Sequence, residues 1–242
     1  MSGLTLSLPL AGRNRNDLLS PFILFDVARR RPGQSRPLTC REQYDGRCGA
    51  GCRWWLPGIG VRSVARENFV GSLGDACPVI HPEAWVAPGA VVVGRVTLGR
   101  AASVWYGSVL RADTDEIVVG ADVNIQDLCC LHVDPGEPVT LEDRVSLGHR
   151  ATVHGAHVET GALIGIGAVV LGGARIGAGS LVAAGAVVPP GTIVPAGVLA
   201  AGVPCRILRE LTDVDRQKFA ETAEHYVQRA AAHRTVNWAV DG

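Results

Sequence analysis

Three histidines lie close together in the middle of this chain. His149 and His154 fall within the stretch LGHRATVHG (147–155), and His132 precedes them in LCCLHVD (128–134). Imidazole nitrogens are common ligands of divalent metals, and three of them that leave a fourth position open to water make the arrangement of many catalytic zinc sites. Whether these three can meet depends on the elements that carry them.

A six-residue repeat carries the histidines. An aliphatic residue recurs every six positions, a small residue follows it by four, and glycine often follows it by three, where a corner needs a positive φ. This pattern is typical of a β-helix built from hexapeptides, in which both the aliphatic and the small residue point inward. The aliphatic positions are Ile80, Val86, Val92, Leu98, Val104, Leu110, Val119, Ile125, Leu131, Leu141, Leu147, Val153, Val158, Ile164, Val170, Ile176, Val182, Val188, Val194 and Ala200.

Three hexads make one triangular coil, so the repeat predicts an all-β solenoid of about seven coils. The six-residue step is interrupted after Leu110, after Leu131 and after Val153. We expect loops after Leu110 and Leu131, and loops on a rigid scaffold often carry functional residues.

Outward positions on one face can be stacked by counting hexads. Residues three hexads apart lie above one another in successive coils, about 4.8 Å apart. By this count Arg111, His132 and His154 form one outward column, since each follows an inward aliphatic by one position. Two imidazoles at one strand spacing are well placed to share a metal ion.

His149 belongs to a different face of the coil. It follows Leu147 by two positions, and Asp127 occupies the equivalent place one coil away. One subunit cannot easily bring His149 round a corner to the other two histidines, but a second copy can supply it. A closed ring of such contacts predicts a homotrimer with three metal sites between subunits.

The segments on either side of the repeat differ from it. Residues 1–72 are rich in Arg and show no sustained period, which we interpret as a disordered extension or a mis-assigned start, with an organellar transit peptide as an alternative. The β-helix domain is predicted over 73–205. A helix packed on the coils is expected within 206–242, with Thr212 and Asp215 at its start. Its apolar face would comprise Phe219, Ala223, Tyr226, Val227 and Ala230.

Composition limits the class of protein. Hydrophobic residues make up 47% and charged residues 19% of the chain, and the formal net charge is zero, which favours neither nucleic acid nor an anionic membrane surface as a partner. The longest apolar runs fall short of the ~20 residues of a membrane helix. Seven irregularly spaced cysteines argue against a disulfide framework and for a cytoplasmic location.

The motifs around the histidines resemble those of the γ-class carbonic anhydrases, within the hexapeptide-repeat, left-handed β-helix superfamily. They are VLRADTDEI (109–117), NIQD (124–127), LH (131–132), LGH (147–149) and VHG (153–155), and the resemblance covers roughly residues 78–235. It implies a left-handed coil and a lyase, carbonate dehydratase, acting on a small-molecule substrate. The reaction would be the reversible hydration of CO₂ to bicarbonate by a zinc-bound hydroxide.

The resemblance also implies roles for the residues that match its motifs. His132, His149 and His154 would be the zinc ligands, with His149 supplied by a neighbouring subunit. Arg111 and Asp113 would form an ion pair between subunits and line the site.

The resemblance also implies residues that position the water at the metal and residues that transfer its proton. Gln126 would position the water at the metal, with Asn124 and Asp127 behind it. The best-known family pattern places a glutamate proton shuttle in an acidic loop after the first histidine. Here that loop is only HVDPGEPVT, where Asp134 and Glu137 are the candidates.

Several alternatives stay open. Imidazoles also suit Fe²⁺ and Co²⁺. The same scaffold serves acyl-CoA-dependent transferases, and the site could hydrolyse a thioester or belong to a non-catalytic metal-binding assembly protein. Of the other histidines, we interpret His157 as structural, and His225 and His233 as solvated positions on the C-terminal helix.

Overall fold

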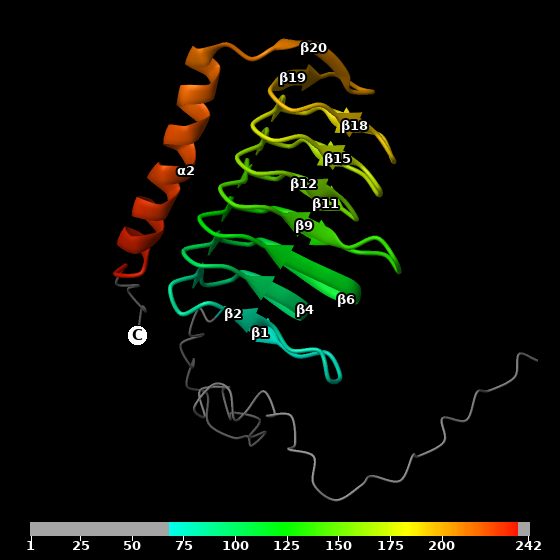
Figure 1. Ribbon diagram of the computed structural model, residues 1–242. Coiled ribbons are helices and arrows are strands. Elements are labelled where there is room, and N and C mark those ends of the chain that lie inside the picture. The colour runs from blue at the N-terminus through cyan, green and yellow to red at the C-terminus, as the bar shows by residue number, and fades with distance from the viewer. Residues whose placement is uncertain (1–67, 237–242) are drawn as a thin grey trace, which may run out of the picture. The chain divides into compact units, whose positions relative to one another are not determined.

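The computed structural model describes residues 68–236, which wind into a stack of coils with one long helix beside it (Figure 1). Short strands of successive coils pair in parallel, and the fold is a left-handed parallel β-helix of about seven turns. The predicted fold class is therefore confirmed. The predicted extension, 1–72, is wrong at its end, because residues 69–71 form a strand that pairs in parallel with residues 91–93 of the coil. Its remaining part, 1–67, lies outside the described residues.

The coil has three faces. The helix face consists of β3 (Trp85–Val86), β5 (Ser103–Val104), β7 (Asn124–Ile125), β10 (Ser146–Leu147), β13 (Leu163–Ile164), β16 (Leu181–Val182) and β19 (Val198–Ala201). The histidine face consists of β1 (Phe69–Gly71), the first parts of β4 (Val91–Leu98) and β6 (Val109–Val119), β8 (Cys130–His132), β11 (Thr152–His154), β14 (Val169–Val170) and β17 (Val187–Val188). The third face consists of β2 (Val79–Ile80), the ends of β4 and β6, β9 (Val139–Leu141), β12 (His157–Val158), β15 (Arg175–Ile176) and β18 (Ile193–Val194).

The core of the coil follows the hexad pattern. Every aliphatic position named above is buried except Ile80, which lies in the first coil and is only partly covered. The small residues four positions later are buried as well, and the corner glycines have positive φ, 69° at Gly107 for example. Stacked aliphatics thus fill the coil, and each buried one contributes roughly 1.5–3 kcal/mol.

The first predicted loop is wrong. Residues after Leu110 continue as one strand, β6, instead of leaving the sheet. Its register against β4 shifts, since Gly94 pairs with Ala112 and Val96 pairs with Ile117. Residues 113–116 therefore lie opposite Arg95 alone, so the strand contains three extra residues that form a bulge.

The second interruption is a tight turn between β8 and β9. Asp134 and Glu137 form an isolated antiparallel bridge there, and the Glu137 N–H donates to the Asp134 carbonyl at 2.9 Å. The bulge of β6 supports this turn from the preceding coil. Thr114 Oγ1 donates to the Val133 carbonyl, and the Gly136 N–H donates to Asp115 Oδ2, each at 2.9 Å.

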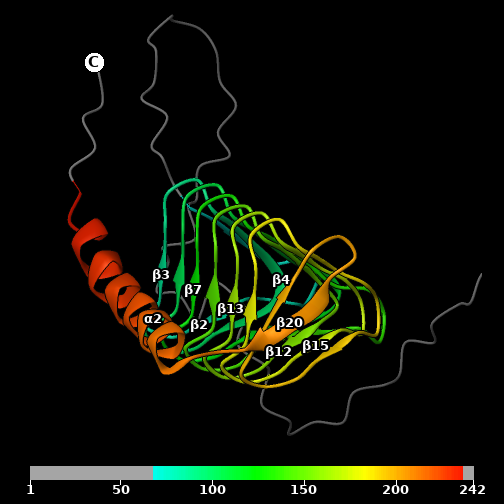
Figure 2. The same ribbon diagram turned by 90° about the horizontal axis from the view of Figure 1, so that it is seen from above.

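After the last coil, β20 (Arg206–Glu210) pairs antiparallel with β19 and leads to α2 (Asp213–His233). The first residues of the range predicted as helix thus form a strand. Thr212 and Asp215 close a capping box at the start of α2, as predicted. The helix runs along the helix face (Figure 2). Of the predicted apolar residues, Ala223, Tyr226 and Ala230 are buried.

Aromatic rings fasten α2 to the coils. Trp105 lies at the centre, with its ring 5.2 Å from that of Tyr226 and 4.9 Å from that of His233. His233 Nδ1 is also 2.8 Å from the hydroxyl of Tyr106, and Trp85 packs on the same cluster. The prediction that His233 is solvated was wrong, because its ring contacts Trp85, Trp105 and Tyr106. These partners lie more than a hundred residues earlier in the chain.

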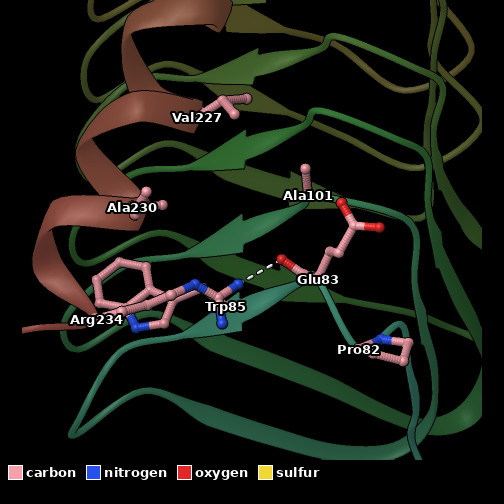
Figure 3. A pocket seen from close by; sticks show the side chains of 8 residues that line it. Pro82, Glu83, Trp85, Ala101, Val227, Ala230 and Arg234 are labelled. Carbon is pink, nitrogen blue, oxygen red and sulfur yellow. Dashed lines mark hydrogen bonds between the residues drawn. The ribbon is translucent and has the colours of Figure 1, made fainter.

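The end of α2 is held by backbone groups of the first coil. Arg234 donates hydrogen bonds to the carbonyls of Glu83 and Ala84, beside a cavity that Trp85 also lines (Figure 3). A second cavity lies along the same helix near Phe219. Neither cavity is lined by the three histidines of interest. Among the described residues, no helix combines the length and apolar character needed to cross a membrane.

A charged network ties two coils together on the third face. Glu142 accepts hydrogen bonds from the Thr160 N–H at 3.0 Å and the Thr160 hydroxyl at 2.8 Å, and its other oxygen is 2.7 Å from His157 Nε2. These hydrogen bonds, led by that of His157, lower the pKa of Glu142 from 4.5 to about 2. His157 is thus structural, as predicted.

Replacing Glu142 by Gln should destabilise the fold in a pH-dependent manner. A carboxylate whose pKa is lower in the folded state stabilises it above the unfolded pKa, and this contribution disappears as the pH falls from about 4.5 towards 2. Because the side chain is 37% exposed, screening limits the loss at neutral pH to about 1 kcal/mol. Chemical denaturation of wild type and E142Q at several pH values measures it.

Glu224→Gln is the matched control, since Glu224 is exposed on α2 and makes no hydrogen bond or ion pair within the described residues. E224Q should leave the unfolding free energy nearly unchanged at every pH. A constant difference between wild type and E142Q down to pH 2 would contradict the assignment.

Candidate metal centre

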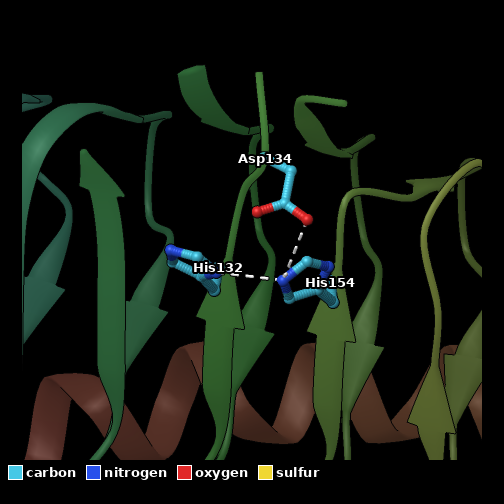
Figure 4. Close-up of side chains that lie close together, drawn as sticks. All are labelled: His132, Asp134 and His154. Carbon is cyan, nitrogen blue, oxygen red and sulfur yellow. Dashed lines mark hydrogen bonds and ion pairs between the residues drawn. The ribbon is translucent and has the colours of Figure 1, made fainter. Parts of the chain in front are cut away.

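Two of the three histidines face each other on adjacent coils. His132 pairs with His154 in the register between β8 and β11, and with Arg111 between β8 and β6, as the hexad count predicts. His132 Nδ1 lies 3.0 Å from His154 Nε2 (Figure 4). Both rings are partly buried. The outward column therefore brings two imidazole nitrogens to one point.

An acidic residue orients the first of these rings. Asp113 Oδ1 lies 3.0 Å from His132 Nε2, and the other Asp113 oxygen pairs with Arg111 of the same chain. Desolvation opposes ionisation of Asp113, but hydrogen bonds from His132 and Arg111 outweigh it and lower its pKa. A hydrogen bond from His132 Nε2–H to Asp113 leaves the Nδ1 lone pair pointing at His154, which is how carboxylates commonly fix metal-binding histidines.

A second carboxylate approaches from the turn after β8. Asp134 Oδ2 lies 3.8 Å from His154 Nε2, and ligand atoms of His132, Asp134 and His154 all lie within 4.8 Å of one another (Figure 4). Glu137 takes another direction. Its side chain packs over Gly172, where an added Cβ would stand 2.2 Å from Glu137 Oε2.

His149 lies elsewhere in this chain, at the corner between the helix face and the histidine face. Its Nδ1 is 2.8 Å from Asp127 Oδ2 in the preceding coil, which fixes the ring. Its Nε2 is 3.4 Å from the hydroxyl of Tyr226 on α2. The sequence predicts Tyr226 only as part of the apolar face of the helix, and no motif or spacing in the sequence relates it to His149. One chain does not bring His149 to His132 and His154.

The remaining predicted residues also belong to this corner. Gln126 and Asn124 are buried, and Gln126 Nε2 donates to Asn124 Oδ1 at 3.0 Å. Asn124 Nδ2 in turn donates to Ser146 Oγ at 2.7 Å. Gln126 directly follows β7 and precedes Asp127, so it lies on the side of His149 and not of His132.

Apolar side chains stand exposed on both sides of His149. Leu128 is 60% exposed and Ile166, one coil further on, is 47% exposed. Leu128 also has a φ of 62°, in the left-handed region that costs a leucine roughly 1 kcal/mol or more. The Leu128 side chain lies over Gly107 but stays largely exposed, which is consistent with contact to another molecule.

The two facing imidazoles fit a divalent metal. Zinc–nitrogen bonds of 2.0–2.1 Å at a tetrahedral ion separate two ligand nitrogens by about 3.3 Å. The observed 3.0 Å between His132 Nδ1 and His154 Nε2 needs only a small rotation of either ring to reach that value. With Asp113 holding His132, the donor set is one that zinc, iron or cobalt accepts.

Comparison with known proteins agrees with these motifs, although no family model matches the chain. A "Probable carbonic anhydrase" of Methanocaldococcus jannaschii is 51% identical over 143 residues, which cover 59% of this chain and 90% of that protein. "Gamma carbonic anhydrase 3, mitochondrial" of Arabidopsis thaliana is 45% identical over 193 residues, 77% of this chain and 75% of that protein.

The chain belongs to the γ-carbonic anhydrase-like family of hexapeptide-repeat proteins.

A solved structure with the same fold carries the name of a different class of enzyme. The crystal structure of a "hexapeptide transferase family protein" from Anaplasma phagocytophilum has a TM-score of 0.65 and 34% identity, and the likeness covers 69% of this chain and 98% of that one. γ-Carbonic anhydrase-like and transferase-named proteins thus share one coil. The residues on its outer surface, not the fold, must decide the reaction.

Proposed function

We propose that this chain is a γ-class carbonic anhydrase that hydrates CO₂ to bicarbonate reversibly at a metal ion shared between subunits. The approach of His132 Nδ1 to His154 Nε2, at 3.0 Å, carries the proposal. A bound zinc ion lowers the pKa of a water molecule to about 7 and so supplies a nucleophile at neutral pH. Fe²⁺ or Co²⁺ would suit the same nitrogens.

The third ligand comes from a second copy in this proposal. Asp127 fixes His149 Nδ1, so Nε2, which lies 3.4 Å from the Tyr226 hydroxyl in the single chain, is the nitrogen that would bind the metal of a neighbour. Exposed Leu128 and Ile166 flank it and supply the apolar contact of an interface. Three such contacts, corner against histidine face, close a homotrimer.

In this proposal the two subunits contribute different side chains to the site. Asp113 holds His132 in the tautomer that presents Nδ1, and Arg111 keeps Asp113 ionised. Gln126 would enter with His149, from the same neighbour, and its amide would orient the reacting water while Asn124 fixes Gln126.

Other parts of the proposal rest on the same site. Asp134 and Glu137 remain the candidates for proton transfer, and Asp134 is the nearer to His154. The Arg111–Asp113 pair lies within one chain here, so its place between subunits stays a prediction. A cytoplasmic location, and the lack of nucleic-acid and membrane partners, also remain predictions.

CO₂ hydration, followed by stopped flow on metal-analysed protein, tests the reaction. His154→Ala should lower the rate at least about 100-fold and reduce the bound metal, because it removes one of the two facing nitrogens. His225→Ala is the control, since His225 is exposed on α2, and should behave like wild type. Full metal occupancy without hydration would refute the carbonic anhydrase reaction and leave a metal-binding assembly protein or a thioesterase.

Subunit mixing tests whether His149 acts in trans. Chains carrying His149→Ala and chains carrying His154→Ala should each be inactive alone. In a mixed trimer, one of the three interfaces joins an intact histidine face to an intact corner. Purified mixed trimers should therefore show about a third of wild-type activity, and an unfractionated random mixture about a quarter. Co-expression with two affinity tags isolates the mixed species. No recovery in a confirmed mixture would show that the site does not span two chains.

Asp113→Asn should weaken zinc binding by about 10–100-fold, the usual effect of removing a carboxylate that orients a ligand histidine. Competition with a chromophoric chelator measures it. Glu116→Gln is the control, since Glu116 is an exposed carboxylate of the same strand and its side chain makes no hydrogen bond or ion pair among the described residues. Equal affinities of D113N and wild type would exclude the orienting role.

An acyl-CoA-dependent transferase is the second candidate, because the solved relative described above carries a transferase name. Such enzymes need a single histidine as general base and no metal. Saturable binding of acetyl-CoA to metal-free protein, unaffected by added zinc, would favour this candidate over carbonic anhydrase.

A further inference from the structure

We propose that each chain carries a metal site of its own, formed by His132, His154 and Asp134, which holds the ion until His149 of a neighbouring subunit replaces Asp134. The inference rests on the proposed metal centre and adds how that centre is filled. It assigns to Asp134 the role of an exchangeable third ligand.

The three donors already converge within one chain. His132 and His154 present nitrogens 3.0 Å apart, and Asp134 Oδ2 stands 3.8 Å from the second of them. All three ligand atoms lie within 4.8 Å of one another, while bonds of 2.0–2.2 Å bring neighbouring ligand atoms to about 3.0–3.4 Å. Asp134 must therefore move by about 1 Å. Its side chain is 55% exposed, so little packing opposes that movement.

The surroundings hold the donors in place without a second chain. Asp113 fixes His132 through Nε2. The turn that carries Asp134 is pinned to the preceding coil by the Thr114 hydroxyl and the Asp115 carboxylate. Two histidines and one carboxylate form a recognised set for divalent metals, Fe²⁺ included.

His149 cannot be part of this single-chain set. Its Nδ1 is engaged by Asp127 and its Nε2 faces Tyr226, at a different corner of the coil. An unassembled chain that relied on three histidines would offer only two. With Asp134 it offers three donors, and the approach of His149 on assembly exchanges a carboxylate oxygen for an imidazole nitrogen.

A double-mutant cycle on Co²⁺ binding tests the exchange. The four proteins are wild type, Asp134→Asn, His149→Ala and the double variant, with affinities from chelator competition and ligand sets from visible spectra. We expect D134N to change the wild-type affinity less than about 3-fold. In the H149A background it should weaken Co²⁺ binding at least about 10-fold, because Asp134 is then the third ligand.

Glu137→Gln is the matched control, a carboxylate of the same turn that packs over Gly172, and it should have no effect in either background. Sedimentation shows whether H149A still assembles. The single-chain site predicts Co²⁺ binding in either case, so loss of assembly does not spoil the test.

The outcomes separate this inference from the proposed function. Equal effects of D134N in both backgrounds, or no Co²⁺ bound by H149A, would overturn the exchange, even if wild type binds metal and hydrates CO₂. The expected cycle in a protein that does not hydrate CO₂ would uphold the exchange and refute the carbonic anhydrase reaction. Wild type without any Co²⁺ affinity would refute both.

Discussion

The stacking of successive coils at the spacing of one parallel strand pair is the constraint on which this structure depends. Buried aliphatics such as Leu131 and Val153 fix the rotation of each strand, so that the next residue must point outward above its counterpart. The hydrogen bond from the Gly155 N–H to the His132 carbonyl, at 3.0 Å, locks this register beside the histidines. Two imidazoles therefore stand opposite each other because the core places them there.

The corner that carries His149 is organised by different forces. Trp105 and its neighbouring rings dock α2 against the helix face, and this docking brings the Tyr226 hydroxyl to His149 Nε2. Asp127 fixes the other nitrogen from the coil before. Core packing thus sets the position of His132 and His154, whereas the docked helix and the contact with Asp127 set the orientation of the His149 ring. Disturbing α2 would therefore displace His149 and leave His132 and His154 in place.

Sequence periodicity predicted what depends on local pattern. The hexads identified the core, the positive-φ glycines and the column of Arg111, His132 and His154. The hexads wrongly predicted a loop after Leu110, because residues 113–116 do not follow the six-residue pattern. Only the pairing with β4 shows that β6 continues through them as a strand. His233 was misjudged for a related reason. Its aromatic partners are distant in the chain, and a local sequence pattern does not predict such a contact.

The shape of the scaffold favours the proposed position of the site between two chains. A triangular coil is convex, and its hexads dictate only the inward positions, so that one face alone offers a flat row of side chains and no enclosed site. A solved relative named as a hexapeptide transferase has the same coil, so the coil alone does not determine the chemistry of the outward residues. An enclosed site needs either a second chain packed against this face or a segment that departs from the hexad pattern. The turn that carries Asp134 is such a departure, and it is the place where one chain alone approaches a complete set of ligands.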